Sequence, residues 1–188
     1  MIKIYRNQNI GHEISSDITH PLKNLLETPS LTLERKADFL AKLGSAYLQA
    51  KMSAKAALIL LRTASLLQPQ NPELHCYLAS AYFLDGQTDQ SIGQCDMALQ
   101  LDPNFPKAHF IRAIVLDETG RIEEAISAYQ KYLSLKPEDI VAYIRIGLAY
   151  EKIDKVDEAK NVWRKILQID PQNTVALNNM RRLEDSSP

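Results

Sequence analysis

Four prolines recur at a constant distance along this 188-residue chain. Pro69, Pro103, Pro137 and Pro171 are each separated by 34 residues. Proline interrupts a helix because it lacks the amide hydrogen and its ring clashes with the preceding turn. A constant period of about 20 to 50 residues is typical of repeat proteins, in which each repeat is one supersecondary unit. The spacing therefore favours an array of short repeats.

Side-chain size follows the same 34-residue period. One column holds large side chains, a second holds small ones and a third holds glycine: Tyr82, Leu116 and Tyr150; Ala79, Ala113 and Gly147; Gly86 and Gly120. Small residues let two helices approach closely, and glycine suits the position that ends a helix. Asp154 stands where a third glycine is expected, and an aspartate tolerates that turn less well.

Each period contains two stretches with helical spacing. Residues 140–153 and 156–169 both carry apolar side chains three and four residues apart, with a break between them at Asp154–Lys155. Asn71 and Asp139 stand at the helix-capping position, whereas Phe105 is a weak cap in the same series. We expect a pair of helices in every repeat.

These residues resemble the tetratricopeptide repeat (TPR). The matching residues of the last period are Tyr143, Ile146, Gly147, Tyr150, Ala159, Trp163 and Pro171. The resemblance implies an all-α fold, a right-handed α-solenoid of about four TPR helix-turn-helix repeats followed by a C-terminal capping helix. In such an array each repeat buries its apolar face against its neighbours.

The repeats divide the chain into four parts. An N-terminal extension contains a short helix at Leu22–Leu26 and the start of the first repeat helix, for which Ser30 is the expected cap. The parts are residues 1–36, the four repeats in 37–172 (approximately 37–71, 72–105, 106–139 and 140–173), the capping helix 174–184 and the tail 185–188.

The first repeat differs in length from the others. Leu66 and Leu101 are 35 residues apart, so one extra residue is expected near Leu67–Gln68. With that register, Ala56 and Leu60 take the places that Ser91 and Cys95 hold in the second repeat.

Composition and charge exclude several classes of function. The formal net charge is −1, which gives no field for binding phosphate backbones. No segment has the roughly 18 consecutive apolar residues of a membrane span, and the charged first ten residues do not form a secretory signal. We therefore expect a cytoplasmic protein that binds neither nucleic acid nor membrane.

The resemblance also implies where a partner binds. In TPR proteins the concave groove is lined by the first helix of each pair, and many of the corresponding positions here are apolar. They are Cys76, Tyr77, Ser80, Phe83, Lys107, Phe110, Ile111, Ile114, Val141, Ile144, Arg145 and Leu148. Such a surface suits a polypeptide with spaced hydrophobic anchors. It does not suit a carboxylate clamp, because only Lys107 or Arg145 matches the required donors.

The predicted function is thus a non-enzymatic protein–protein interaction module, either a cargo chaperone or an assembly adaptor. An alternative is a self-assembling scaffold whose N-terminal segment docks in a neighbouring copy's groove. A third possibility is that this segment fills the groove of its own chain. The segment carries apolar residues suited to each: Ile2, Ile4, Tyr5, Ile10, Ile14 and Ile18.

No cofactor, metal or catalytic group is expected. His75 and His109 are 34 residues apart in the column of Tyr143, which indicates packing or capping instead of metal ligation. Cys95 lies in the column of Trp163 and is expected in the core, whereas Cys76 is expected to be more exposed. The sequence contains no phosphate-binding glycine loop and no Ser/His/Asp arrangement.

Overall fold

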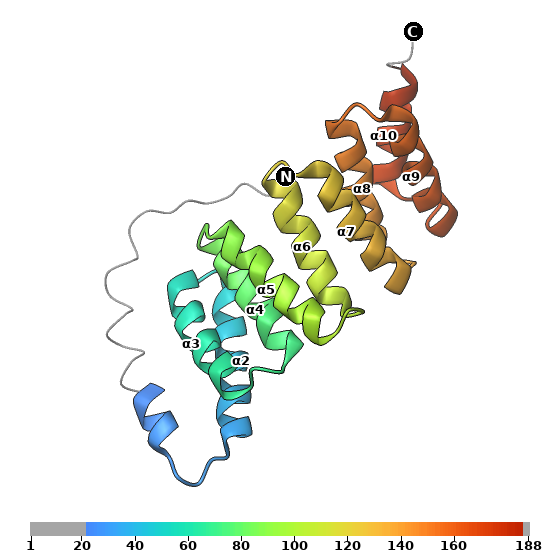
Figure 1. Cartoon of the computed structure of the whole chain (residues 1–188). Coiled ribbons are helices and arrows are strands. Elements are labelled where there is room, and N and C mark those ends of the chain that lie inside the picture. Colours follow the sequence, from blue (N-terminus) through green and yellow to red (C-terminus); the bar gives the residue numbers. More distant parts are fainter. Residues whose placement is uncertain (1–21, 186–188) are drawn as a thin grey trace. The chain divides into compact units, whose positions relative to one another are not determined.

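The computed structural model describes residues 22–185, and all regular structure in that range is helical (Figure 1). The chain divides into two compact units, Met1–Leu101 and Asp102–Pro188. Each unit is built from antiparallel helix pairs, as the period predicts. The first helix of a pair is the one that comes first along the chain.

The first unit contains two helix pairs preceded by a short helix at residues 22–27. The pairs are α2 (Leu33–Gln49) with α3 (Ala54–Leu67), and α4 (Pro72–Leu84) with α5 (Thr88–Leu101). Helix α3 also packs against α4, so the second helix of one pair contacts the first helix of the next.

The second unit repeats this arrangement and ends with a single helix. Its elements are α6 (Pro106–Glu118) with α7 (Ile122–Leu135), α8 (Ile140–Lys152) with α9 (Val156–Ile169), and α10 (Thr174–Asp185). Helix α7 packs against α8, and α9 packs against α10.

Side chains cap two helix starts, those of α4 and α8, where the sequence predicts capping. The Asn71 side chain accepts a hydrogen bond from the Glu73 amide at 3.0 Å. Asp139 caps α8, and Phe105, the predicted weak cap, makes no side-chain hydrogen bond at the start of α6. The expected cap at Ser30 is wrong, because α2 begins later and Thr32 accepts from the Arg35 amide instead.

The turn within each pair places one residue in the left-handed conformation. Gly86 and Gly120 have φ of 80° and 81°, and Asp154 has φ of 56° at the equivalent position. Lys51 occupies this position in the first pair with φ of 52°. Glycine adopts this conformation without the penalty that other L-residues incur, so two of the four turns carry some strain.

The extra residue of the first repeat lies in this turn and not near Leu67–Gln68. The first helices α2 and α4 end 35 residues apart, at Gln49 and Leu84. The second helices α3 and α5, however, begin and end 34 residues apart. The insertion therefore falls at Met52–Ser53, between the helices of the first pair.

An insertion in this turn changes which residues of the first pair are equivalent to those of the other pairs. Ala57 and Leu61, instead of Ala56 and Leu60, take the places of Ser91 and Cys95. Both are fully buried. Leu66 is not equivalent to Leu101, and its side chain is 82% exposed.

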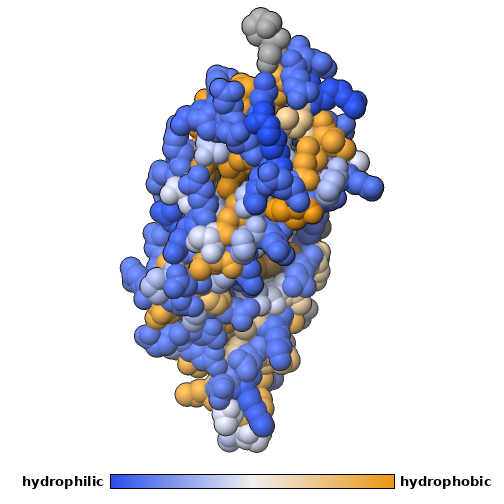
Figure 2. All heavy atoms as spheres, turned by 90° about the vertical axis from the view of Figure 1, so that its right-hand side faces the viewer, coloured by the Kyte–Doolittle hydropathy of each residue, from blue (hydrophilic) through white to orange (hydrophobic). Residues whose placement is uncertain are grey.

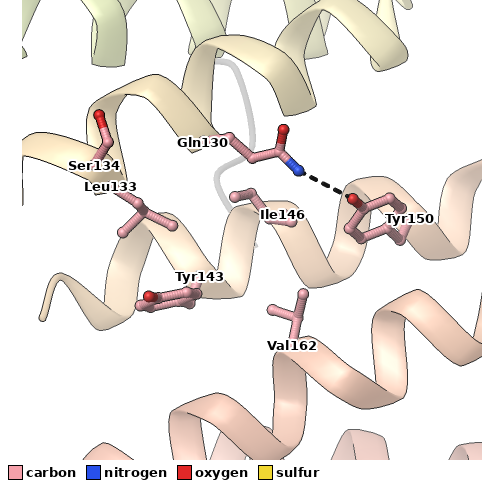
Figure 3. Close-up of a pocket in the computed structure, with 7 residues that line it drawn as sticks. All are labelled: Gln130, Leu133, Ser134, Tyr143, Ile146, Tyr150 and Val162. Carbon is pink, nitrogen blue, oxygen red and sulfur yellow. Dashed lines mark hydrogen bonds between the residues drawn. The ribbon is translucent and has the colours of Figure 1, made fainter. Parts of the chain in front are cut away.

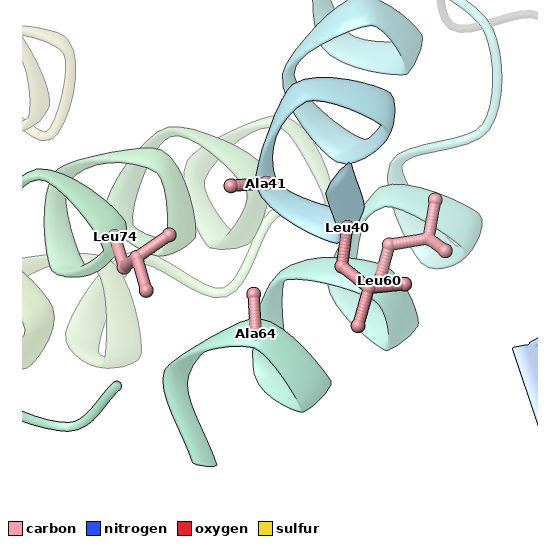
Figure 4. Close-up of a cluster of buried hydrophobic side chains, with 5 residues drawn as sticks. All are labelled: Leu40, Ala41, Leu60, Ala64 and Leu74. Carbon is pink, nitrogen blue, oxygen red and sulfur yellow. The ribbon is translucent and has the colours of Figure 1, made fainter. Parts of the chain in front are cut away.

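The two helices of a pair approach closely at a small residue. A Cβ atom added to Gly147 would lie 2.7 Å from the Trp163 ring, and one added to Gly44 would lie 2.6 Å from Leu61. Trp163 is fully buried and forms one cluster with Ala159, Ile166, Ala176 and Leu183. In the first unit, a buried cluster joins three helices through Leu40, Ala41, Leu60, Ala64 and Leu74 (Figure 4).

Two glycine-to-alanine substitutions test this close approach. Gly147→Ala should lower the free energy of unfolding by about 1–3 kcal/mol, because the rigid indole of Trp163 must shift to admit the methyl group. Gly93→Ala is the matched control, since Gly93 lies inside α5 with open space around the added Cβ. It should raise stability by about 0.5–1 kcal/mol. Urea denaturation of both variants measures the difference, and changes of the same sign would contradict the assignment.

Candidate protein-binding surface

In the first unit, helix α4 carries the predicted groove residues. Tyr77, Ser80 and Phe83 are partly buried. Cys76 is fully buried, so the expectation that it is exposed is wrong. Its neighbours on the helix, Leu74, His75 and Leu78, are also buried. Cys76 therefore belongs to the interior and contributes no surface to a partner.

Tyr77 contacts the core and also presents a polar end. Its ring packs against buried clusters that include Leu40 and Leu61. Its hydroxyl donates to the Glu73 carboxylate at 2.9 Å. Burial raises the pKa of Tyr77, and the hydrogen bond to Glu73 raises it further. The hydroxyl therefore stays protonated at neutral pH and remains a hydrogen-bond donor.

In the second unit, helices α6 and α8 carry the remaining predicted groove residues. Val141 and Leu148 on α8 are 56% and 39% exposed. The others are partly buried: Lys107, Phe110, Ile111, Ile114, Ile144 and Arg145. A space-filling view shows apolar patches between polar side chains on the face that it presents (Figure 2). Single exposed hydrophobic residues need no functional explanation. Val141 and Leu148 lie seven positions apart and therefore on the same side of α8.

Phe110 belongs partly to the core. Its ring lies 5.9 Å from that of Tyr129 in an edge-to-face arrangement and 4.8 Å from that of Tyr132. Both tyrosines belong to α7, the partner helix of α6. Aromatic pairs of this geometry stabilise packing. Phe110 therefore holds α6 to α7 in addition to presenting its exposed part.

Two acidic residues at the end of α6 pair with two basic residues of α8. Asp117 is bound by Lys152, and the Arg145 guanidinium lies 3.8 Å from the Glu118 carboxylate. Both pairs join α6 to α8. The nearby apolar side chains are thus flanked by charges that already have partners within the same unit.

Glu151 is a structural residue as well. Its carboxylate accepts from the Trp163 indole at 3.0 Å and is bound by Arg182 of α10. The side chain of Glu151 is only 15% exposed. This carboxylate joins α8, α9 and α10.

The two repeating histidines have the structural role that their spacing predicts. The Nε2 atom of His75 lies 3.0 Å from the carbonyl of Pro69, and that of His109 lies 2.9 Å from the carbonyl of Pro103. His75 also contacts the Gln94 side chain through Nδ1 at 2.8 Å. Cys95 is buried, as predicted. Within residues 22–185, no group of three or more His, Cys, Asp or Glu is arranged to hold a metal ion.

Sequence reasoning did not predict a pocket between α7, α8 and α9. This cavity of about 330 Å³ is lined by Gln130, Leu133, Ser134, Tyr143, Ile146, Tyr150 and Val162 (Figure 3). The Gln130 amide donates to the Tyr150 hydroxyl at 3.2 Å across it. A short side chain marks this pocket in the sequence. Val162 lies two repeat periods after Gln94, whose longer side chain reaches across to His75.

No helix in the described part of the chain is long and apolar enough to cross a membrane. Stacked antiparallel helix pairs with partly exposed first helices define a class of protein, the helical-repeat modules that bind other polypeptides.

Comparisons with known proteins identify the family. Two models described as tetratricopeptide repeat match residues 106–139 and 140–173. A crystal structure of MamA is 31% identical over 72% of this chain and 74% of that chain, with a TM-score of 0.66. The chain therefore belongs to the tetratricopeptide-repeat family and has its α-solenoid fold. It is a protein–protein interaction module.

Two further solved structures share the fold at lower identity. PilF of Pseudomonas aeruginosa is 23% identical, with a TM-score of 0.70 over 80% of this chain and 68% of that one. YrrB, whose structure is described as a TPR protein with an unusual peptide-binding site, is 20% identical, with a TM-score of 0.68 over 88% and 84%. Comparison with curated protein sequences gives no match.

The contact between Tyr132 and Asp139 predicts an alkaline loss of stability. Burial, the 2.5 Å hydrogen bond to Asp139 and its negative charge raise the pKa of Tyr132 to about 12. An unfolded tyrosine loses its proton near pH 10. Between about pH 10 and 12 the unfolded state therefore binds fewer protons, so the free energy of unfolding should fall as pH rises.

Thermal unfolding of wild type and Tyr132→Phe from pH 8 to 12 measures this effect. The Phe variant should lose stability less steeply above pH 10, because one tyrosine no longer titrates. Tyr129, whose pKa burial also raises, keeps part of the slope in both proteins. Identical slopes for the two proteins would refute the assignment.

Proposed function

We propose that this TPR module binds a partner polypeptide through the apolar side chains of its first helices, acting as a cargo chaperone or assembly adaptor in the cytoplasm. The proposal concerns two surfaces, each within one unit: the partly exposed residues of α4 in the first unit, and those of α6 and α8 in the second. These are Tyr77, Ser80, Phe83, Lys107, Phe110, Ile111, Ile114, Val141, Ile144, Arg145 and Leu148. The mechanism is sequestration of hydrophobic segments, without chemistry on the partner.

One observation carries the proposal: Asp117 and Glu118 of α6 pair with Lys152 and Arg145 of α8, while Val141 and Leu148 stay exposed. A partner therefore gains more from apolar contact here than from ion pairing, because Asp117, Glu118 and Arg145 already have partners. This favours a ligand with hydrophobic anchors over a charged terminus.

The free energy available from burying apolar side chains limits the form of the ligand. Burying three anchors at about 1.5–3 kcal/mol each gives roughly 5–9 kcal/mol. The association cost is about 4–15 kcal/mol, so three anchors give weak binding. Useful affinity needs a longer ligand, further anchors or multivalent contact.

Substitutions at exposed positions test the surface without disturbing the core. Leu148→Asp and Val141→Asp should each reduce partner capture about tenfold or more, since each removes one anchor. Leu177→Asp on α10 is the matched control, because Leu177 is exposed to a similar degree, 43% against 39% for Leu148. Phe110 is unsuitable because it packs against Tyr129 and Tyr132.

A quantitative pull-down with purified variants, followed by mass spectrometry, provides the readout. Circular dichroism verifies that each variant keeps its helicity. Equal capture by Leu148→Asp and Leu177→Asp would refute binding at this surface.

The alternative function is a self-assembling scaffold whose N-terminal segment docks in a neighbouring copy's groove. Residues 1–21 lie outside the described residues. Light scattering coupled to size exclusion compares the full chain with a chain beginning at Leu22, which retains the leucines that pack against α2 and α3. The scaffold predicts assemblies that dissociate when residues 1–21 are removed, and assemblies that persist would exclude this version.

A further inference from the structure

The first helix of the array leaves an apolar face uncovered within the described residues. Phe39 and Leu43 on α2 are 53% and 36% exposed. Leu74 and Leu78 hold the equivalent positions 35 residues later on α4 and are only 2% and 3% exposed. The same face of the helix is thus buried in one pair and exposed in the other.

The difference arises from what precedes each first helix. Helix α3 covers this face of α4, where Leu74 clusters with Leu60 and Ala64. Helices α7 and α9 contact α8 and α10, whose residues Ala142 and Ala176 are fully buried. Within the described residues, only the helix at residues 22–27 precedes α2, and its leucines pack against the cluster around Leu40. This preceding helix is too short to cover a 17-residue helix.

The short helix already binds to this end of the first unit. Leu22, Leu25 and Leu26 pack against the buried cluster of Leu40 and its neighbours. The Lys36 ammonium donates to the Leu26 carbonyl at 2.6 Å. Figure 1 shows this helix, in blue, next to α2. An established contact therefore begins at residue 22, where the chain arrives from the N-terminal segment.

The segment just before residue 22 carries apolar residues that suit the uncovered face of α2. Ile10, Ile14 and Ile18 are spaced by four residues, which places them on one side of a helix. Pro21 disfavours a helical His20, so a helix over these residues would end there. At about 1.5 Å per residue, the three isoleucines span about 12 Å, enough to pass both Phe39 and Leu43.

We propose that Ile10, Ile14 and Ile18 bind the exposed face of α2 at Phe39 and Leu43 in the same chain. They complete the cover that residues 22–27 begin. The segment then covers this face of α2 as α3 covers the equivalent face of α4. This inference does not depend on binding at the proposed surface of α4 or at that of α6 and α8.

Tethering favours the same chain over a second copy. The segment is joined directly to residues that already contact α2 and α3, so its effective concentration at this face is on the order of millimolar. A second copy at micromolar concentration competes poorly against that value. A segment held on α2 is also withheld from a neighbouring groove.

Cysteine cross-linking tests the proposal in the full-length chain. Both native cysteines, Cys76 and Cys95, are buried, so introduced cysteines are the reactive ones. The test variant combines Ile14→Cys with Leu43→Cys. The matched control combines Ile14→Cys with Leu148→Cys, because Leu148 on α8 is exposed to a similar degree, 39% against 36%. A short bismaleimide cross-linker joins the two introduced cysteines even if they do not lie directly opposite each other.

The expected result is an internal cross-link in the Leu43 variant, formed at least tenfold faster than any cross-link in the Leu148 variant. Gel electrophoresis separates internal from intermolecular products, and mass spectrometry identifies the joined peptides. Equal rates in both variants would overturn the proposal. So would cross-links at Leu43 that join only two chains, or a faster reaction at Leu148.

A second measurement guards against disturbance by the cysteines. Hydrogen exchange of the α2 amides is compared between wild type and Ile14→Asp. Exchange in α2 should speed up at least tenfold in the variant, while α8 exchange stays unchanged. Unchanged exchange in α2 would count against a covering segment.

Discussion

The structure depends on close contact between the two helices of each pair at a small residue. Gly147 beneath Trp163 and Gly44 beneath Leu61 show why the position must stay small: an added Cβ would fall within 3 Å of the facing side chain. The apolar residues that face away from this contact have no partner inside the pair. They are buried by the neighbouring helix, as Leu74 is by α3 and Ala176 is by α9. Stability is therefore shared between neighbours.

Features set by local chemistry could be predicted from the sequence. Helix ends follow from Pro72 and Gly86, and caps follow from Asn71 and Asp139, because each acts on the backbone within a few residues. The sequence pattern misplaces the insertion in the first repeat for a related reason. Leu66 and Leu67 are both leucine, so the column of Leu101 fits either of them, and only the turn geometry separates the two registers.

The proposed binding surface was less predictable because burial depends on neighbouring helices. The helical period alone does not distinguish Cys76 from the partly buried Tyr77 and Ser80 beside it, yet the fold encloses Cys76 completely. The pairing of Asp117 with Lys152 joins residues 35 apart, beyond the reach of helical periodicity. These contacts decide which side chains remain available to a partner. They arise only when the pairs stack.

Glu151 links the only tryptophan of the chain to its last helix. Its carboxylate accepts the indole hydrogen of Trp163 and is bound by Arg182 of α10. Departure of α10 would expose the surroundings of that indole and remove the arginine that binds its hydrogen-bonding partner, Glu151. The emission of a single fluorophore thus reports the fraying of one end of the solenoid, without any label being added.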